Sequence, residues 1–454
     1  MTQSLEVCIL AAGVGSRMCS DKPKVLQTLA GKPLLEHLLE TVSSFSPTRV
    51  HVVVGQGSEE VKAKFADRTD IKWVYQAERK GTGHAMQQAA PGIDPDSRVL
   101  ILLGDAPLVK RATLDELTSV DADLTVLTVD MVEPYNYGRI LRQDERVMEI
   151  IEEKDANKQQ RSITEINSGV MVADGRKLVS WLKQLTDDNA QKEFLLTDIV
   201  RYANDGGSIV KAYKTNDPVE VTGINTFSQL AGLERALQQK TAQQLMDQGV
   251  QLMDPARIDV RGNLVVGRGV SIDVNTIFEG EVTIGDDVAI GPNCVITDSQ
   301  IGTGSVIKAN SVLERAIVGE RCSVGPFARL RPGAELEDEV AVGNFVEIKK
   351  TKLGKGSKAS HLAYLGDSSI GAGANIGAGT ITCNYDGVNK YETYIGDGAF
   401  IGSNSSLVAP VRIGAGATIG AGSTITKDVE ANVLALGRGK QKSIANWQRP
   451  TKKD

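Results

Sequence analysis

A six-residue period of branched apolar residues runs through the second half of the chain and limits what that half can fold into. The first run consists of Val266, Ile272, Phe278, Ile284, Ile290 and Ile296. After a slip of one residue the period resumes at Ile301, and with further short slips it continues to Ile425. Neither an α-helix nor a plain alternating strand has this period. A parallel β-helix does, because each of its short faces contributes one inward apolar residue before the chain turns.

With three such segments per coil, residues 265–427 should form about nine coils, and we expect the left-handed parallel β-helix of hexapeptide repeats. The many glycines, 46 in the chain, and the low aromatic content of 4% suit the tight corners of such a fold. The period vanishes between Ile376 and Ile395, over the segment Thr382–Lys390. Insertions in a solenoid become loops on one face, often the binding face, although a tolerated surface loop is the more common outcome.

The first half has a different pattern, in which short apolar runs alternate with helical segments. The runs are Val7–Leu10, Val50–Val54, Val99–Leu103 and Leu124–Val129, and the helical segments include Leu34–Phe45 and Ser58–Ala66. This order predicts an α/β domain, Rossmann-like, with a mostly parallel sheet that binds ligands at the carboxyl ends of its strands. Residues 227–249 predict a linking helix, which places the domain limits at 1–226 and 250–454.

Composition excludes several classes of protein. A formal net charge of −6 argues against nucleic-acid binding, and no stretch is long and apolar enough to span a bilayer. Five scattered cysteines without metal-type spacing indicate a reducing compartment, so we expect a cytoplasmic protein that binds neither nucleic acid nor membrane.

A glycine-rich loop follows the first predicted strand. Gly13 and Gly15 let backbone N–H groups approach phosphates, and Arg17 and Lys24 add positive charge. The loop is neither a dinucleotide-binding fingerprint nor a Walker loop. A Gly-x-Gly pair alone is often a tight turn, but with two cations at the mouth of an α/β sheet it favours phosphate binding.

A carboxylate follows another predicted strand. Gly104 lets the backbone turn after Leu103, and this places Asp105 where it could bind Mg²⁺, which takes one or two protein ligands plus phosphate oxygens. An Asp that merely caps a helix or turn has the same local pattern.

Several short motifs together resemble one enzyme family. The loop Leu10–Arg17 with Pro23-Lys24 is similar to the signature of sugar-nucleotide pyrophosphorylases. Further matching segments are Gln76–Glu78, Gly81–Ala85, Tyr137–Ile140, Glu152–Asp155, Glu165–Gly169, Gly223–Asn225, Arg329–Ala334, Ile376–Thr380 and Asn384–Gly387. With the hexapeptide half, the chain resembles end to end the bifunctional N-acetylglucosamine-1-phosphate uridylyltransferase/glucosamine-1-phosphate acetyltransferase family. The resemblance implies synthesis of UDP-N-acetylglucosamine, a precursor of cell-wall peptidoglycan and lipopolysaccharide.

The resemblance also implies the residues of the uridylyltransferase site. Arg17 and Lys24 would contact the triphosphate as catalytic cations, and Asp105 and Asn225 would bind Mg²⁺. The nucleotide and the sugar would be bound by Leu10, Ala11, Ala12, Gly13, Lys24, Gln76, Gly81, Thr82, Leu103, Gly104, Asp105, Gly138, Glu152, Asn167 and Asn225.

For the acetyltransferase, the resemblance makes His361 the general base, since an amine that attacks a thioester must be neutral. His37 and His51 lie in a helix and a strand, which favours structural roles. His84 lies in the predicted nucleotide loop, so its role could be structural or functional. Glucosamine-1-phosphate would contact Arg331, Lys349, Tyr364 and Asn375. Acetyl-CoA would contact Ala378, Asn384, Tyr385, Ser403, Ala421 and Arg438. A homotrimer is implied, with acetyl-CoA, UTP and glucosamine-1-phosphate as small-molecule substrates.

The chain departs from the family pattern at Leu103, where many relatives carry Tyr, and around Arg438.

Two other hypotheses remain open. The β-helix could serve only assembly, which His361, the Asn384-Tyr385 loop and the Arg331/Lys349 pair argue against. The whole chain could be a non-catalytic scaffold, which the charged residues around Asp105 argue against.

Overall fold

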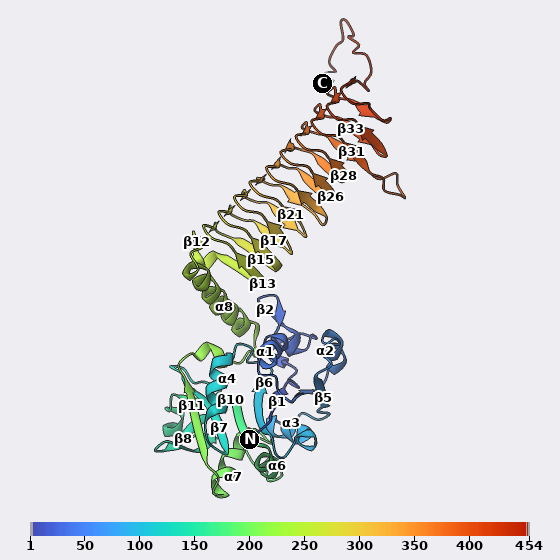
Figure 1. The fold of residues 1–454 in the computed structure, drawn as a ribbon. Helices are drawn as coiled ribbons and strands as arrows, with labels where there is room; N and C mark the ends of the chain where they lie inside the picture. The colour runs from blue at the N-terminus through green and yellow to red at the C-terminus, as the bar shows by residue number, and fades with distance from the viewer. Residues whose placement is uncertain (1–2, 451, 453–454) are drawn as a thin grey trace. The chain divides into compact units, whose positions relative to one another are not determined.

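The structure, a computed structural model, describes residues 3–450 and 452, which form two compact units (Figure 1). The first unit ends at Leu237 and the second begins at Gln238, so the division falls inside the long helix α8 (Phe227–Asp247). The helix predicted from residue 227 to 249 is confirmed, ending at Asp247. The domain limits at residues 226 and 250 stay a prediction.

The first unit is built on one mixed sheet whose long path runs β11-β7-β10-β6-β1-β4-β5, with the hairpin β8-β9 attached through β10. All pairings along this path are parallel except those of β10, which is antiparallel to both of its neighbours. The strands are β1 (Leu5–Leu10), β4 (Arg49–Val54), β5 (Ile71–Tyr75), β6 (Arg98–Leu103), β7 (Leu124–Asp130), β8 (Arg139–Gln143), β9 (Arg146–Ile151), β10 (Glu165–Asp174) and β11 (Val210–Thr215). A small hairpin, β2 (Thr28–Leu29) and β3 (Lys32–Pro33), lies outside this sheet.

Helices cover both faces of the sheet, and each face has its own apolar core. One core contains residues of α1 (Leu34–Ser43), α2 (Ser58–Lys64) and α4 (Arg111–Ser119). The other contains residues of α3 (Thr82–Ala89), α6 (Gly175–Leu182) and α7 (Ile199–Asp205). The short helix α5 (Lys158–Arg161) contributes to neither. Alternate residues of β1 serve the two cores, Val7 and Ile9 on one face and Cys8 on the other. The predicted α/β fold is therefore confirmed.

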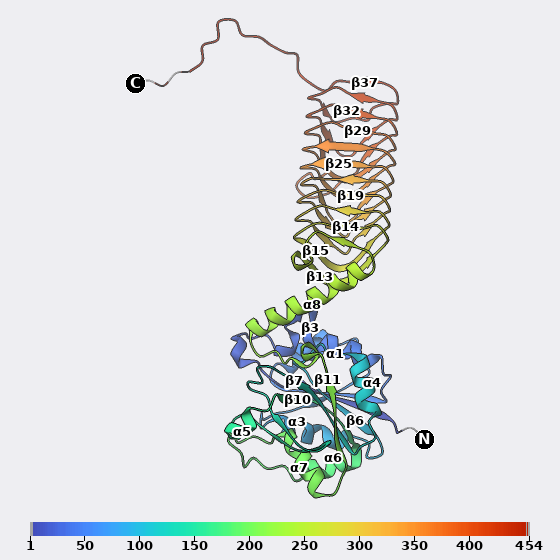
Figure 2. The ribbon, with the colours of Figure 1, turned by 90° about the vertical axis from the view of Figure 1, so that its left-hand side faces the viewer.

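The second unit is a parallel β-helix, as predicted. Figure 2 shows strands of one of its sheets stacked above one another. That 11-stranded sheet contains β12 (Gln251–Leu252), β14 (Ser271–Ile272), β16 (Ala289–Ile290), β19 (Val306–Ile307), β22 (Ser323–Val324), β25 (Ala341–Asn344), β27 (Lys358–His361), β29 (Asn375–Ile376), β32 (Phe400–Ile401), β35 (Thr418–Ile419) and β37 (Leu434–Ala435).

The 15-stranded sheet forms the remaining faces of the coils. It contains β13 (Ile258–Val266), β15 (Thr276–Ile284), β17 (Val295–Thr297), β18 (Gln300–Ile301), β20 (Val312–Glu314), β21 (Ile317–Val318), β23 (Arg329–Leu330), β24 (Ala334–Leu336), β26 (Glu347–Leu353), β28 (Tyr364–Ile370), β30 (Ile381–Cys383), β31 (Thr393–Ile395), β33 (Ser406–Val408), β34 (Val411–Ile413) and β36 (Thr424–Ile425). All pairings between its strands are parallel.

The residues of the six-residue period form the core of the β-helix. From Ile272 to Ile425 each is buried in one continuous cluster, and Val266 packs against it. The insertion predicted after Ile376 keeps the stack intact, because Ile376 pairs directly with Ile401 of the next coil. The coils extend beyond the predicted range 265–427, to β12 and β37. The residues through which β12 and β37 pair with the neighbouring coils include Leu252 and Ala435, respectively. Both are only partly buried, which is why the six-residue apolar period does not extend to them.

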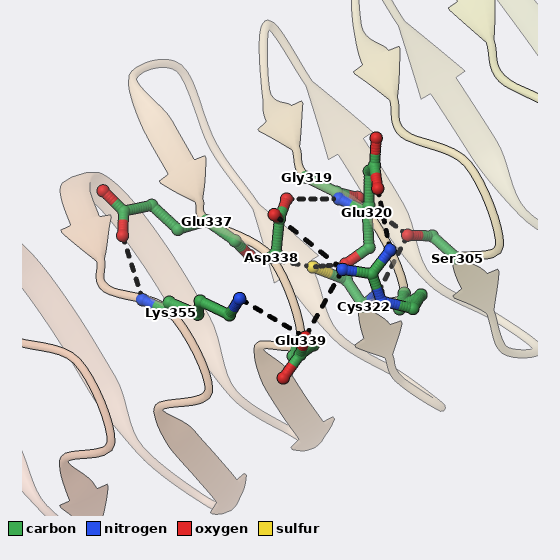
Figure 3. A network of polar contacts seen from close by, with 9 residues as sticks. Ser305, Gly319, Glu320, Cys322, Glu337, Asp338, Glu339 and Lys355 are labelled. Atoms are coloured by element: carbon green, nitrogen blue, oxygen red, sulfur yellow. Dashed lines mark hydrogen bonds and ion pairs between the residues drawn. The ribbon is translucent and has the colours of Figure 1, made fainter.

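Polar side chains close some corners of the β-helix from one coil to the next (Figure 3). Asp338 accepts a hydrogen bond of 2.9 Å from the backbone N–H of Glu320, which lies one coil earlier. The buried hydroxyl of Ser305 donates to the Gly319 carbonyl and accepts from the Cys322 backbone N–H. These bonds satisfy backbone groups at positions where the strands are too short to do so.

Candidate functional site

A cavity of about 340 Å³ lies at the carboxyl end of β1 in the first unit. The glycine-rich loop follows β1, Gln76 follows β5, and Leu103 ends β6, so three parallel strands of the sheet bring these residues to the same edge. Of the predicted nucleotide and sugar residues, this cavity is lined by Leu10, Ala11, Ala12, Gly13, Lys24, Gln76, Gly81, Thr82, Leu103 and Asp105.

Two contacts fix the part of this cavity that Gln76 and Gly81 form. The buried amide of Gln76 donates to the Gly81 carbonyl at 3.2 Å and lies 3.0 Å from the His84 ring. His84 therefore helps to hold the Gln76 amide in position. Gly81 has φ 106°, and a Cβ atom there would lie 2.4 Å from the Phe194 carbonyl oxygen. Only glycine fits this position without moving the backbone.

A second cavity of about 240 Å³ adjoins the first and shares Thr82, Leu103 and Asp105 with it. All but one of the remaining predicted residues of the first unit line it, namely Arg17, Gly138, Glu152, Asn167 and Asn225. Gly104 lines neither cavity. A Cβ atom on Gly104 would lie 3.0 Å from the Leu10 carbonyl oxygen, so this glycine instead lets the end of β6 pack against the start of the glycine-rich loop.

The carboxyl group of Glu152 lies in the second cavity, and burial raises its pKa. The Thr197 hydroxyl, which donates to Glu152 at 3.1 Å, partly offsets this effect of burial. Thr197 and Tyr137 also line this cavity, and the sequence analysis assigned a role to neither. Tyr137 stands beside Gly138 in a segment already singled out, whereas nothing in the local sequence around Thr197 indicates a site.

Lys24 joins the predicted metal ligands. Its ammonium is paired with the Asp105 carboxylate and donates to the Asn225 side-chain oxygen at 2.9 Å. Both oxygens therefore converge on a single cationic atom at the junction of the two cavities. Arg17, in the short 3-10 helix Ser16–Met18, is exposed and lines only the second cavity, whereas Lys24 lines only the first, so each cavity has one of the two predicted cations.

In the second unit, His361 lies exposed at a corner of the β-helix, at the end of β27. Its Nδ1 atom is 2.6 Å from the side-chain oxygen of Asn344, its register partner on the preceding coil. Because an amide oxygen can only accept, Nδ1 carries the hydrogen and Nε2 is left free to accept a proton. Asn344 was not among the predicted residues, since its proximity to His361 depends on the coil register.

The predicted sugar-phosphate residues come from successive coils. The Arg331 guanidinium donates to Glu347 at 2.7 Å, and Glu347 is the register partner of Tyr364 in the next coil. Lys349 lies two residues beyond Glu347 on the same strand, β26. Lys349 and Tyr364 belong to the 15-stranded sheet and Arg331 directly follows its strand β23, whereas Asn375 lies in the 11-stranded sheet, close in sequence to the corner at Ala378.

The predicted acetyl-CoA residues follow one corner of the β-helix. The Ala378 and Ser403 carbonyls each accept from the next coil, and the Arg438 guanidinium donates to the Ala421 carbonyl at 2.8 Å. Arg438 therefore extends this ladder. In the inserted loop, Asn384 is buried and donates to the Asp367 carboxylate, while Tyr385 is exposed.

Within residues 3–450 and 452, none of the helices has the length and apolar character needed to cross a membrane. The same described residues include no group of three or more His, Cys, Asp or Glu side chains arranged to hold a metal ion. A site made of one carboxylate and one amide, such as Asp105 with Asn225, is too small to count as such a group.

Models of known protein families match segments in both halves of the chain. Residues 7–196 match the MobA-like NTP transferase domain, residues 260–354 match the GMPPB C-terminal domain, and residues 392–427 match the bacterial transferase hexapeptide (six repeats).

Curated relatives match along the whole length. The chain is 56% identical to the bifunctional protein GlmU of Idiomarina loihiensis, with 99% of each chain covered. It is 54% identical to that of Pseudoalteromonas atlantica, again with 99% of each covered. It is 52% identical to that of Cellvibrio japonicus, with 99% of this chain and 100% of the relative covered. The chain belongs to the GlmU family, whose bifunctional enzymes combine a uridylyltransferase with an acetyltransferase.

Proposed function

We propose that the chain makes UDP-N-acetylglucosamine in two steps with the residues described above. The second unit transfers the acetyl group of acetyl-CoA to the amino group of glucosamine-1-phosphate. The first unit then transfers uridylyl from UTP to N-acetylglucosamine-1-phosphate. The observation that carries the assignment of the first unit is that the two cavities share Asp105 and that each is lined by one of the two predicted cations, Lys24 and Arg17.

For uridylyl transfer, the nucleotide occupies the first cavity and the sugar phosphate the second. An oxygen of the sugar-1-phosphate forms a bond to the α-phosphorus of UTP, and the bond to pyrophosphate breaks. The attacking oxygen is already ionised at neutral pH, so no protein nucleophile is needed. Lys24 and Arg17 neutralise the phosphates and hold the attacking and leaving groups in line, which is most of what such a transfer requires.

Family membership implies a divalent metal ion for the nucleotidyl transfer, and we assign it as Mg²⁺ held by Asp105 and Asn225. These oxygens fit the ion, because both already point at one cationic atom, the Lys24 nitrogen. Two protein oxygens are also the small ligand set that Mg²⁺ commonly takes beside substrate phosphates. When bound, the ion would neutralise charge on the phosphate oxygens.

For acetyl transfer, Nε2 of His361 accepts a proton from the amino group of the sugar as its nitrogen bonds to the thioester carbonyl carbon. The carbon–sulfur bond then breaks, and His361 passes the proton to the leaving sulfur, so that the coenzyme leaves as a thiol and the imidazole is neutral again. Asn344 holds the imidazole in the required tautomer through its contact with Nδ1. Arg331 and Lys349 bind the sugar phosphate, and Tyr364 and Asn375 bind the sugar.

The corner ladder of Ala378, Ser403 and Ala421 provides the surface on which acetyl-CoA lies. Arg438 lies at the end of this ladder and contacts the phosphates of the coenzyme. Asn384 and Tyr385 of the inserted loop complete the acetyl site. A binding role for this loop is supported by its anchoring, because Asn384 is buried and donates to the Asp367 carboxylate while Tyr385 stays exposed beside it.

The active assembly is a homotrimer. The support is an apolar corner beside His361 that consists of Phe327, Phe345 and Leu362 on three successive coils. Their side chains are 48%, 56% and 61% exposed, and the two phenylalanine rings stack with centroids 5.2 Å apart. All three have positive φ, between 51° and 56°, which is costly for bulky residues. Burial against another copy would offset that cost and enclose the exposed His361.

The test is an assay of the purified chain with glucosamine-1-phosphate, acetyl-CoA, UTP and Mg²⁺, which follows free thiol and pyrophosphate separately. We expect thiol release to precede pyrophosphate release, and pyrophosphate release to depend on acetyl-CoA. Pyrophosphate release only from added N-acetylglucosamine-1-phosphate, without thiol, would reduce the β-helix to an assembly module and refute the role of His361.

A further inference from the structure

Arg139 is a fully buried arginine directly behind the second cavity of the first unit. It is the first residue of β8, its side chain is 1% exposed, and it immediately follows Gly138, which lines the cavity. Its register partners are Ile151 on β9 and Ile166 on β10. Each of these partners precedes a residue that lines the cavity, so Arg139 lies where three cavity-lining segments meet.

The charge of Arg139 is only partly compensated. One terminal nitrogen, Nη1, donates to the Tyr137 carbonyl, and the other, Nη2, lies 4.0 Å from the Glu153 carboxylate. Its Nε atom is buried and has no hydrogen-bond partner. A guanidinium has five N–H donors, and burying it with so few partners costs free energy. If this position only had to fill the core, an apolar side chain would do so at a lower cost in free energy.

The carboxylate that faces Arg139 has a second partner. The same oxygen of Glu153 accepts a hydrogen bond from the backbone N–H of Asn136, a residue with φ 66°. Tyr137, Arg139, Glu153 and Asn136 thus form a closed ring of contacts. This ring, which we call the arginine clamp, joins the loop 135–138 to the loop 152–155, and the second cavity is lined by the first loop and by Glu152 of the second.

The arginine clamp sets the spacing between Gly138 and Glu152 inside the second cavity, and this spacing is short. A Cβ atom on Gly138 would lie 2.8 Å from the Ile150 side chain and 3.6 Å from the Glu152 carboxylate. The Gly138 backbone therefore lies directly against Glu152, and its carbonyl accepts from the Asn167 backbone N–H at 2.9 Å. Any movement between the two loops would change the spacing of Gly138, Glu152 and Asn167, which face the same ligand.

We propose that Arg139 and Glu153 are positioning residues for the acceptor sugar. They set the spacing of the loops that bind N-acetylglucosamine-1-phosphate without touching it, and so determine its affinity while leaving the nucleotide cavity unchanged. This inference rests on the proposed function of the second cavity. A purely structural arginine would instead lower the stability of the unit and disturb both substrates together.

The test compares Glu153→Gln and Arg139→Lys with the unsubstituted full-length chain. KM and kcat are measured for N-acetylglucosamine-1-phosphate and for UTP, each with the other substrate saturating. For Glu153→Gln we expect KM for the sugar to rise roughly tenfold, because the change removes the negative charge that faces Arg139 and leaves the Asn136 N–H with a neutral acceptor. KM for UTP and kcat should stay within about twofold, the spread of a neutral surface change.

Arg139→Lys should shift KM for the sugar in the same direction and further, because a single ammonium cannot reach both the Tyr137 carbonyl and Glu153. The matched control is Arg142→Met in the same strand. Arg142 is paired with Glu165 at 2.6 and 2.8 Å, but it does not line the cavity. Its loss should leave both KM values unchanged. The thermal melt of each variant reports whether the first unit is folded, and acetyl transfer by the second unit reports whether the rest of the protein is intact.

Unchanged sugar KM in Glu153→Gln, or equal changes in both KM values with a lowered melting temperature, would overturn the proposal. Glu152→Gln in the same assay separates the two levels of inference. If it raises sugar KM while Glu153→Gln does not, the clamp is refuted and the sugar site stands. If Glu152→Gln also leaves sugar KM unchanged, the assignment of the second cavity fails and the clamp with it.

Discussion

The side-chain oxygen of Asn225 accepts a 2.9 Å hydrogen bond from the ammonium of Lys24, although the two residues lie near opposite ends of the first unit's sequence. The same ammonium is paired with Asp105, and the Lys24 side chain is only 7% exposed. Three separate segments therefore bring one cation and two oxygen ligands to the junction of the two cavities. The predictions for the first unit begin from this arrangement.

Asp105→Ala should abolish uridylyl transfer, with a fall of at least about a hundredfold, because it removes a charged metal ligand. It also leaves Lys24 buried beside Asn225 alone. Acetyl transfer should be unchanged, since its residues lie in the other compact unit. Pyrophosphate and thiol release measured on the same preparation check this. Loss of both activities in a protein that still melts cooperatively would contradict the assignment of two independent sites.

His361→Ala should do the reverse, lowering acetyl transfer by roughly 10²- to 10⁴-fold, the usual effect of removing a general base. Asn344→Ala should give a smaller loss, roughly tenfold, because the imidazole remains but its tautomer and orientation are no longer fixed. Thiol release with acetyl-CoA measures both effects. An Asn344→Ala enzyme as active as the unsubstituted one would show that the 2.6 Å contact with His361 plays no part.

Glu152→Gln should stabilise the first unit while weakening sugar binding. Burial raises the pKa of Glu152, so the folded state disfavours the ionised carboxylate, and the cost appears as pH rises through that raised pKa. At pH 8 the variant should therefore be more stable by about 1 kcal/mol, a common size for a single substitution. The gain should shrink as pH falls below the carboxyl pKa. Thermal melts at several pH values check this, and a gain that grows on acidification would contradict it.

Phe345→Gly tests the proposed trimer. The residue is 56% exposed with φ 56°, a conformation that glycine adopts without strain. The monomer should therefore lose little or no stability, while sedimentation should show the assembly dissociating. Acetyl transfer should fall by at least about tenfold, since burial of an aromatic anchor commonly contributes 2 kcal/mol or more to an interface. An intact trimer with full acetyl transfer would refute the role of this corner.

Much of the fold follows from the sequence alone. The six-residue period identifies the residues of the β-helix core, because each repeat places the same inward position on the next face of the coil. The apolar runs and helical segments of the first half predict its strands and helices with small shifts at the ends, such as α1 ending at Ser43 instead of Phe45. Nearly every residue of the first unit that the resemblance names also lines one of the two cavities, Gly104 being the exception.

The sequence could not supply the contacts between residues distant along the chain. Nothing local places Asn344 beside His361, Thr197 on Glu152, or Glu153 opposite Arg139. Gly104 shows the converse. Its motif predicts a binding residue, yet Gly104 lines neither cavity and instead lets two strands approach each other closely.

The physical reason is the range over which each kind of information acts. Periodicity and turn residues determine local geometry, which the chain expresses within a few residues. The partner of a side chain depends instead on strand register and on how the layers pack, and these are decided by the whole fold. The sequence therefore determined the two architectures and the family, while only the tertiary structure decided which side chains meet.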